Sequence, residues 1–233
     1  MSRTQTSDRT DVRRYPRTVT FEGWPPTALH FFEDLETDNS KPFWLADKAV
    51  YESDVRAPMQ ALLVELADEF GHGKVFRPNR DVRFSADKAP YKTNIGATLT
   101  EGGYVQLSAD GLAAGAGYHR LESDQLERFR AAVDDDYTGG RLLKLAAKIE
   151  KAGITISSHG SLKSAPRGFA KDHPRIDYLR RKNLIGWQEW PVEPWLGTAA
   201  VKERVAGFPR SVQPLSGWLD RYVGPSELVR EGR

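Results

Sequence analysis

The chain has 233 residues, with 34 lysines and arginines against 32 aspartates and glutamates, so its formal net charge is +2. This near-balance excludes a histone-like or ribosomal-type polycation, whose affinity for phosphate depends on a large overall excess of positive charge. The chain contains no cysteine, which excludes a disulfide scaffold, a thiol nucleophile, an iron–sulfur cluster and a cysteine-ligated zinc site. No stretch approaches the roughly 18 apolar residues of a membrane helix, so we expect no membrane partner and a cytoplasmic location.

The two ends of the chain predict segments outside the folded domain. Residues 1–19 are basic, rich in Ser and Thr, and lack the apolar region of a secretory signal. Their composition also resembles a transit peptide, but they show no amphipathic apolar face, which favours a disordered basic leader. Residues 224–233 predict a flexible tail, which leaves residues 20–223 for the domain itself.

The first part of the domain predicts helices. Apolar residues at helical spacing predict a helix over 27–37, and a longer helix is expected to begin near residue 40. Pro58 should kink or restart this helix, because proline lacks a backbone N–H and its ring clashes with the preceding turn. The apolar stripe continues to Phe70, after which glycines are expected to end the helix.

The pattern changes after residue 73, where short β-like runs alternate with polar turns. Turn residues at 101–103 and 109–111 are spaced for an antiparallel meander. The glycines around residue 115 lack the spacing of a dinucleotide-binding fingerprint, so they predict a bulge or a close approach of the backbone. The predicted strands of this region are 75–77, 82–84, 95–99, 104–108 and 112–118.

The remainder of the chain mixes helical patterns with two more β-like runs. The chain shows no internal repeat and no linker long enough to separate two domains. We therefore expect a single α+β domain with a mostly antiparallel sheet flanked by N-terminal and C-terminal helices. Predicted strands lie at 154–157 and 184–190, and predicted helices at 122–134, 139–151, 175–182, 194–206 and 211–222.

The positive charge is concentrated in three segments. Residues 1–20 carry five arginines and two aspartates, residues 77–92 carry five basic and two acidic residues, and residues 162–183 carry seven basic and two acidic residues. The rest of the chain has a net charge of −9. The small total therefore hides a divided charge distribution, with two positive segments inside the predicted domain.

The first of these positive segments lies in a predicted loop over residues 77–94, which we call the central loop. Asp81 and Asp87 interleave there with arginines that recur every three residues. Arginine offers fork-shaped donors that suit phosphate or carboxylate, which points to an anionic ligand. The alternative is an Arg–Asp network that only fixes the shape of the loop. The candidate ligand-binding residues are Arg80, Arg83, Ser85, Lys88, Tyr91 and Lys92.

A second basic segment begins with a predicted loop over residues 162–174, which we call the later loop. Its candidates for ligand binding are Lys163 and Arg167. The basic run at 180–182 follows at a predicted helix end. A favourable interaction with the helix dipole is enough to explain its positive charge without a ligand. Our working hypothesis is that the two loops share one cleft.

The same segments resemble a known family. The run FRPNRDVRFSADKAPYKTNIG, residues 76–96, resembles the signature of the domain-of-unknown-function family 2461 of bacteria and fungi, and the likeness extends in order over roughly 20–223. Segments 39–51, 115–118 and 162–174 resemble its helix start, its glycine-rich strand and its second loop. The resemblance implies a shared domain but brings no assigned activity, substrate or cofactor. The residues that match its motifs are Arg80, Asp81, Arg83, Phe84, Ser85, Asp87, Lys88, Pro90, Tyr91, Lys92, Lys163, Pro166, Gly168 and His173.

Familiar catalytic and metal-binding motifs are missing from the sequence. The five histidines show no H-x-H, H-x-x-H or HExxH spacing, so we expect no metal site. The nucleophile elbow G-x-S-x-G and the P-loop are also missing. Asp81, Asp87 and Tyr91 are the candidates for proton transfer, although neighbouring guanidinium groups lower a carboxylate pKa and favour an ionised structural partner.

Two classes of function follow from these residues. The one we favour is binding of a small phosphate- or carboxylate-bearing ligand in a basic cleft formed by the central and later loops. The other is an enzyme acting on an anionic substrate through Asp or Tyr proton transfer. Nucleic acid is a less favoured partner. A flat basic surface with exposed aromatics such as Trp187 and Trp190 would favour nucleic acid, whereas a narrow pocket would favour a small ligand. The residues identify neither a cofactor nor an oligomeric state.

Overall fold

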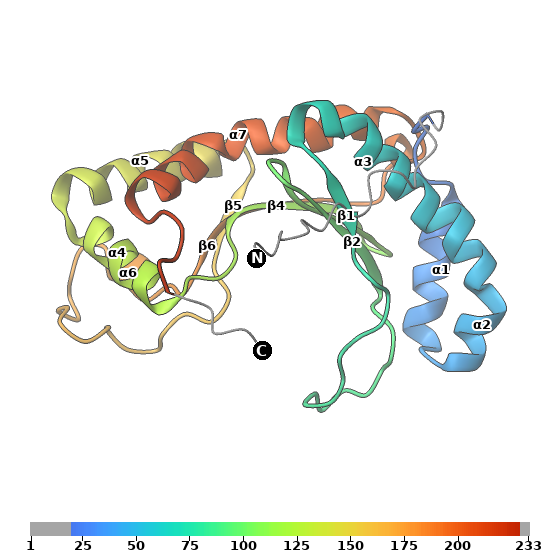
Figure 1. Cartoon of the computed structure of the whole chain (residues 1–233), viewed down its shortest axis with the longest axis horizontal. Coiled ribbons are helices and arrows are strands. Elements are labelled where there is room, and N and C mark those ends of the chain that lie inside the picture. The colour runs from blue at the N-terminus through green and yellow to red at the C-terminus, as the bar shows by residue number, and fades with distance from the viewer. Residues whose placement is uncertain (1–19, 229–233) are drawn as a thin grey trace, which may run out of the picture.

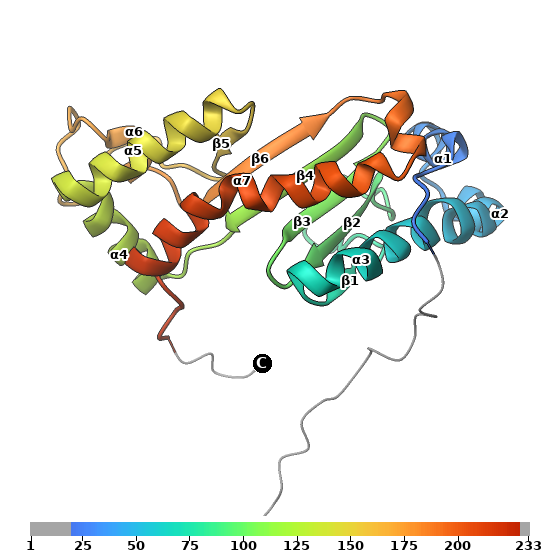
Figure 2. The same cartoon turned by 90° about the horizontal axis from the view of Figure 1, so that it is seen from above.

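The computed structural model describes residues 20–228, so the predicted leader, 1–19, and residues 229–233 of the predicted tail lie outside the described residues. At its centre is a six-stranded antiparallel sheet with the strand order β1-β2-β3-β4-β6-β5. Helices α3 (Ala57–Phe70) and α7 (Ala200–Tyr222) lie across one face of the sheet (Figures 1 and 2). The predicted single α+β domain, with an antiparallel sheet flanked by N-terminal and C-terminal helices, is confirmed.

The N-terminal helices begin close to their predicted positions. The first is α1 (Pro26–Thr37), and the second run consists of α2 (Lys41–Val50), the π-helical segment η1 (Tyr51–Arg56) and α3. The Ser40 hydroxyl accepts a hydrogen bond from the backbone N–H of Phe43 at 3.3 Å and so caps α2.

Pro58 restarts the helix, as predicted, but the chain stays helical on both sides of it. The π-helical segment η1 ends next to this proline, and the backbone N–H of Ala57 donates to the carbonyl of Glu52, five residues back. A π turn is wider than an α turn, so the proline ring avoids the clash that an α turn would impose. The π turn thus joins α2 and α3 into one long element.

The strands confirm most of the predicted β segments. Those predicted at 95–99, 104–108, 112–118, 154–157 and 184–190 agree with the structure to within one residue at each end. The central position belongs to β4, which pairs with β3 on one side and β6 on the other. The strands are β1 (Gly73–Val75), β2 (Asn94–Leu99), β3 (Gly103–Ser108), β4 (Gly111–Tyr118), β5 (Thr155–Ser157) and β6 (Leu184–Trp190).

Two predicted strands require correction. The strand predicted at 82–84 is wrong, and the one predicted at 75–77 ends at Val75. Pro78 has no N–H to extend the ladder. Phe84 is 97% exposed, so the β-like pattern at 82–84 has no layer to pack against. These residues instead belong to a long connection between β1 and β2.

The C-terminal helices differ from the predictions in number and length. The helices α4 (Ser123–Asp134) and α5 (Asp136–Lys151) confirm two predictions, whereas the helix predicted at 175–182 is the single turn α6 (Ile176–Leu179). The helices predicted at 194–206 and 211–222 are replaced by the 3-10 turn η2 (Pro194–Gly197) and the unbroken α7. This long helix tolerates two prolines in its interior because a continuous buried stripe holds it on the core: Val201, Val205, Phe208, Val212, Leu215 and Leu219.

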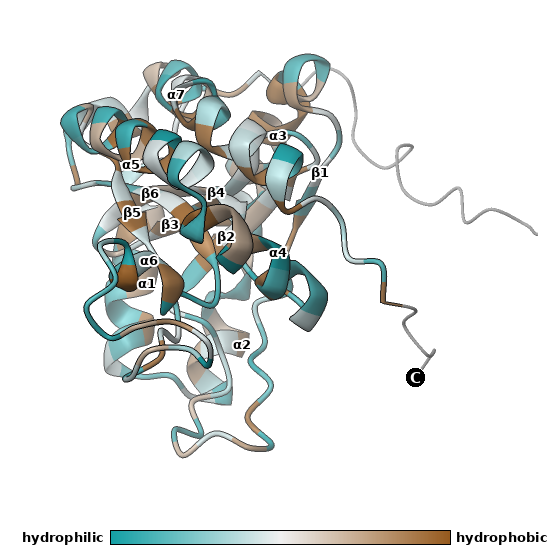
Figure 3. Ribbon diagram, turned by 90° about the vertical axis from the view of Figure 1, so that its left-hand side faces the viewer, coloured by the Kyte–Doolittle hydropathy of each residue, from teal (hydrophilic) through white to brown (hydrophobic). Residues whose placement is uncertain are grey.

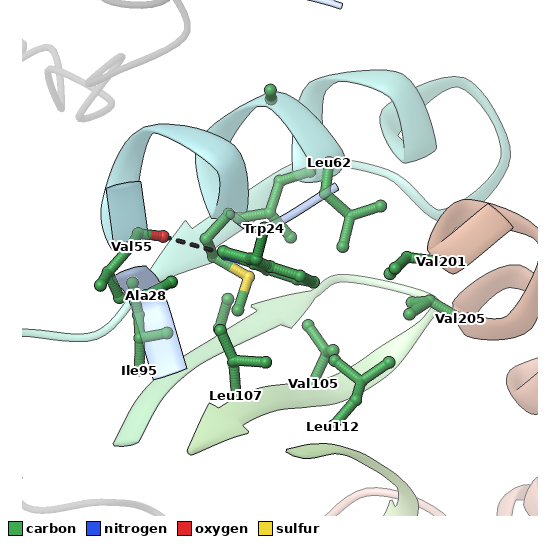
Figure 4. Packing of buried hydrophobic residues seen from close by; sticks show 14 of the residues in the cluster. Trp24, Ala28, Val55, Leu62, Ile95, Val105, Leu107, Leu112, Val201 and Val205 are labelled. Carbon is green, nitrogen blue, oxygen red and sulfur yellow. Dashed lines mark hydrogen bonds between the residues drawn. The ribbon is translucent and has the colours of Figure 1, made fainter. Parts of the chain in front are cut away.

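The hydrophobic core lies between these helices and the sheet. One cluster joins the N-terminal helices to β2 and β3, and a second joins α4, α5 and α7 to β4, β5 and β6. Trp24 fills the first cluster, where its indole N–H donates to the carbonyl of Val55 at 3.1 Å (Figure 4). Hydrophilic residues cover the outer sides of α5 and α7 (Figure 3). Among residues 20–228, no helix is both long and apolar enough to cross a membrane.

The described start of the predicted tail is attached to the domain. The carboxylate of Asp124 accepts hydrogen bonds from the hydroxyl of Ser226 and the backbone N–H of Glu227, both at 2.8 Å. Arg128 donates to the carbonyl of Val223 at 2.6 Å and to that of Pro225 at 2.7 Å. Hydrogen bonds thus join the first residues of the predicted tail to α4.

Candidate functional site

The central loop projects from the sheet as a long hairpin-like connection between β1 and β2 (Figure 1). Its base is held by backbone hydrogen bonds: the N–H of Arg80 donates to the carbonyl of Pro90 at 2.8 Å, and that of Lys92 donates to the carbonyl of Pro78 at 2.9 Å. The tip, residues 81–88, is largely exposed to solvent. The loop thus has an ordered base and an exposed tip.

Local ion pairs hold two of the three arginines of this loop. Arg83 donates two hydrogen bonds to the carboxylate of Asp81, from Nε to Oδ1 at 2.9 Å and from Nη2 to Oδ2 at 2.7 Å. Arg80 pairs with Asp87 through Nη1, which also donates to the carbonyl of Ala89 at 3.2 Å. This arrangement matches the Arg–Asp network that the sequence left open as the alternative to a ligand site.

The two aspartates of the loop are held in their ionised form. Hydrogen bonds from Arg83 lower the pKa of Asp81, and hydrogen bonds from the backbone of Ala89 and from Arg80 lower the pKa of Asp87. At neutral pH both carboxylates are therefore acceptors rather than proton donors. Their geometry suits ion pairing better than general acid catalysis.

Tyr91 anchors the base of the loop in the core. Its ring is 7% exposed and stacks on Trp44, with centroids 4.3 Å apart and an angle of 11° between the planes. The side chain of Asn39 accepts from the backbone N–H of Tyr91 at 2.9 Å and donates to its carbonyl at 3.1 Å. The motif over 39–51 and the central loop are thus parts of one structure. The Tyr91 ring therefore takes part in the packing of the core at the base of the loop.

A polar hollow of about 470 Å³ lies beside this base. Two basic residues, Arg80 and Lys92, contribute to its wall, and Arg80 is already paired with Asp87. Within residues 20–228, Lys92 forms no ion pair with a carboxylate. Burial lowers the pKa of Lys92, and repulsion from Arg77 adds to this effect. The other lining residues are Glu36, Asn39, Asp87, Ala89, Tyr91, Thr93 and Asn94.

The later loop is anchored elsewhere, at the junction of α4 and α5. His173 Nε2 lies 3.1 Å from a carboxylate oxygen of Asp134, and His173 Nδ1 accepts from the backbone N–H of Arg175 at 3.0 Å. Arg175 in turn donates to the carbonyl of Val133 at 2.6 Å and to the carboxylate of Asp136 at 2.9 Å. The central loop and the later loop, which both match family motifs, are thus anchored to different parts of the fold.

The structure does not bring the two loops together at one hollow. No hydrogen bond or ion pair joins residues 77–94 to residues 162–174, and both loops lie fully within the described part of the chain. They also lie apart in Figure 1, on the same side of the sheet. Of the predicted ligand-binding residues, Arg80, Tyr91 and Lys92 meet at the hollow. The others lie at the tip of the central loop (Arg83, Ser85, Lys88) or on the later loop (Lys163, Arg167).

Sequence reasoning overlooked one residue of the hollow and two aromatic residues near it. Glu36 reaches the hollow from the end of α1, and no motif signals its contribution. Phe76 and Tyr104 lie on neighbouring parts of the sheet, with ring centroids 6.0 Å apart. Both residues belong to predicted strands, and Phe76 also begins the run that resembles the family signature. That the two side chains lie on the same face of the sheet becomes clear only when the strand register is known.

No grouping of three or more potential metal-ligating side chains occurs among residues 20–228. The two histidines His119 and His159 lie near each other, with ring centroids 5.6 Å apart, but no carboxylate completes a site around them. We therefore assign no metal ion to the described residues.

Comparison with known proteins identifies the family and nothing beyond it. No curated protein and no solved structure matches the chain significantly. The family described as "Conserved hypothetical protein (DUF2461)" matches residues 27–218. This match spans both basic loops and most of the domain, and it agrees with the resemblance of the central run. The chain belongs to this family.

Proposed function

We propose that the protein binds a small phosphate- or carboxylate-bearing ligand in the hollow at the base of the central loop. The observation that supports this most directly is the position of Lys92, a half-buried cation that lines the hollow without a carboxylate partner among the described residues. An anion next to its ammonium group supplies the missing counter-charge. A partly desolvated lysine gains more from such a contact than an exposed one.

Neighbouring groups complete the anion site. Arg80 uses only Nη1 for its contacts with Asp87 and Ala89, and a guanidinium group carries five N–H donors. It therefore retains donors for a ligand while Asp87 fixes its position. Thr93 and Asn94 add a hydroxyl and an amide to the same wall. This combination of one fixed guanidinium, one ammonium and neutral donors suits a tetrahedral or planar anion.

The acidic residues of the hollow limit where the anion binds. Asp87 is neutralised by Arg80, whereas Glu36 forms no ion pair within residues 20–228. An anion is therefore expected on the Lys92 side of the hollow, away from Glu36. A ligand that also carries a hydroxyl or amino group can place it toward this carboxylate.

The enzyme alternative has less support. Asp81 and Asp87 are paired and ionised, and the Tyr91 ring is packed against Trp44. Each candidate for proton transfer thus has a structural partner. We therefore keep binding as the proposed function.

Calorimetric titration with inorganic phosphate and with citrate tests this proposal. Lys92→Met keeps the aliphatic stem and removes the charge, so affinity should fall about tenfold or more, as for loss of a charged hydrogen bond. Lys148→Met makes the same change on the exposed side of α5 and should change affinity less than twofold. Equal affinities for both variants and the parent, with unchanged melting temperatures, would overturn the proposal.

A further inference from the structure

The face of the sheet opposite α3 and α7 carries aromatic side chains. Along β3, Val105 and Leu107 are 2% and 0% exposed and point toward the helices. Successive side chains of a strand point to opposite faces, so Tyr104 and Gln106 point away from the helices. Figure 1 shows no helix below β2 and β3 on that side. We call this surface, around Phe76, Tyr104 and Trp187, the aromatic face.

Three rings form a row across the aromatic face. The ring centroids of Phe76 and Tyr104 lie 6.0 Å apart with planes at 24°, and those of Tyr104 and Trp187 lie 6.1 Å apart with planes at 21°. Phe76 directly follows β1, Tyr104 lies in β3 and Trp187 lies in β6. The near-parallel rings thus cross most of the sheet.

Two glycines explain why the Tyr104 and Trp187 rings lie close to the sheet. A Cβ atom on Gly96 would lie 2.4 Å from the phenol oxygen of Tyr104, and one on Gly115 would lie 2.7 Å from the Trp187 ring. Any larger residue would therefore displace the ring above it. Gly115 confirms the predicted close approach in the glycine-rich strand. The Tyr104 and Trp187 rings thus each lie with one side against the backbone of a glycine and are half-buried, whereas Phe76 is 37% exposed.

Hydrogen bonds fix the polar edges of the rings. The Tyr104 hydroxyl donates to the side chain of Gln106 at 2.8 Å, and the Trp187 indole N–H donates to the carboxylate of Glu189 at 2.8 Å. Each partner is two residues further along the same strand, on the same face. The rings are thus held in place by their own strands. A preorganised aromatic surface loses little conformational entropy when a flat group stacks on it.

Positive charge lies next to this row. The ammonium group of Lys92 lies 5.5 Å from the centroid of the Phe76 ring, and it also lines the hollow of the proposed anion site. Arg77 adjoins Phe76 in the chain and forms no ion pair within the described residues. The later loop, with Lys163 and Arg167 exposed, hangs below the sheet beyond β5 and β6 (Figure 1). Glu189, which accepts from the Trp187 indole N–H, places a carboxylate at the β6 end of the row.

We propose that the aromatic face binds single-stranded nucleic acid, with consecutive bases stacked on the three rings. The inference rests on the proposed function in one respect: Lys92 holds one phosphate of the strand. Every base presents a flat π face, so an aromatic row with adjacent cations binds a single strand without reading its sequence. Sheets that expose two or three aromatic rings bind unpaired bases in this way. Duplex DNA cannot do so, because its bases stay stacked within the helix.

Fluorescence anisotropy with a labelled thymidine hexamer tests this inference. The matched probe is a hexamer of the same charge that lacks its bases, and the matched variants are Phe76→Leu and Phe84→Leu. Phe84 is 97% exposed at the tip of the central loop and lies outside the row. Phe76→Leu should weaken hexamer binding roughly 5- to 150-fold, the range measured for loss of one stacked base, and Phe84→Leu less than twofold. The base-free hexamer should bind more weakly than the thymidine hexamer.

Two variants at Trp187 distinguish the loss of a stacking ring from misfolding as the cause of weaker binding. Trp187→Phe keeps a flat ring over Gly115 and should retain most of the affinity, whereas Trp187→Leu should lose it. Equal affinity for both hexamers, an unchanged Phe76→Leu variant, or equal binding of thymidine monophosphate or of duplex DNA would each overturn the inference.

The two proposals fail in different ways. If phosphate binds the hollow but the thymidine hexamer does not bind, only the aromatic face is refuted. If the hexamer binds in a base-dependent manner and Lys92→Met changes neither hexamer nor phosphate binding, the anion site is refuted and the aromatic face stands. Phosphate affinity should be the same in Phe76→Leu and in the parent, because that variant leaves the hollow's charges unchanged.

Discussion

The central loop and the later loop are both basic and both match family motifs, but they are held in different ways. In the central loop, Arg83 pairs with a carboxylate two residues away, and Arg80 pairs with one seven residues away. In the later loop region, Arg175 reaches across to the α4–α5 junction, some 40 residues earlier in the chain. Local pairs shape a loop, whereas distant contacts fix it to the fold. Charge alone therefore does not locate a site, and our proposal depends instead on Lys92, which is half-buried and has no carboxylate partner among the described residues.

The largest predicted effect concerns the distant contacts. The Arg175 side chain is 10% exposed and satisfies the carbonyls of Val133 and Asp134. Arg175→Ala should lower the free energy of unfolding by roughly 2–3 kcal/mol, because it leaves these acceptors unpaired. Urea denaturation followed by circular dichroism measures the loss. A change below about 0.5 kcal/mol would show that the later loop is no better anchored than the central loop.

The next effect concerns the contact between the two motif regions at the hollow. Asn39→Ala removes both hydrogen bonds to the backbone of Tyr91 and should cost about 1–2 kcal/mol of unfolding free energy. Asn39→Asp, which keeps an acceptor for the Tyr91 N–H, should cost less. The phosphate affinity of the Ala variant should also fall, because the base of the central loop is loosened. Identical denaturation curves for both variants and the parent would contradict this account of the loop base.

A smaller effect is expected at the tip of the central loop. Arg83→Ala removes the exposed pair with Asp81 and the contact with the exposed Phe84 ring, and solvent screening leaves such exposed pairs with little effect on the free energy of unfolding. Arg83 lies outside the lining of the hollow, so phosphate affinity should change less than twofold. A loss of affinity as large as that of Lys92→Met would move the anion site from the base of the loop to its tip.

The smallest effect is the pH dependence contributed by the two aspartates of the central loop. Their folded-state pKa values are lowered, so the folded protein binds these protons less tightly than the unfolded chain. The stability they contribute is present above about pH 4, the unfolded Asp value, and is lost as the pH falls through the lowered values. The free energy of unfolding, measured by denaturation at several pH values between pH 5 and pH 2, should therefore fall less steeply with decreasing pH in Asp81→Asn and Asp87→Asn than in the parent. A steeper fall would reverse the sign of this linkage.

Local sequence patterns predicted much of this molecule, and long-range contacts account for what they did not predict. The periodicity of the chain identified most strands, and the short spacing of Arg80, Arg83, Asp81 and Asp87 indicated their ion pairs. The contact between Asn39 and Tyr91 spans 52 residues, and no local rule joins two such positions. The row of three rings depends on strand register, since Trp187 lies opposite Gly115 only after β4 and β6 pair. The helix predicted to end before Pro209 continues because tertiary packing outweighs helix propensity.

The central claim is that the anion site lies at the base of the central loop and not on the later loop. Titration of inorganic phosphate into the parent, Lys92→Met and Lys163→Met proteins compares the two loops directly, because each variant removes one lysine charge. Lys163 is exposed and forms no ion pair among the described residues, so its replacement should leave the fold intact. We predict about a tenfold loss of affinity for Lys92→Met and no measurable change for Lys163→Met. Full affinity in Lys92→Met together with a loss in Lys163→Met would contradict the claim.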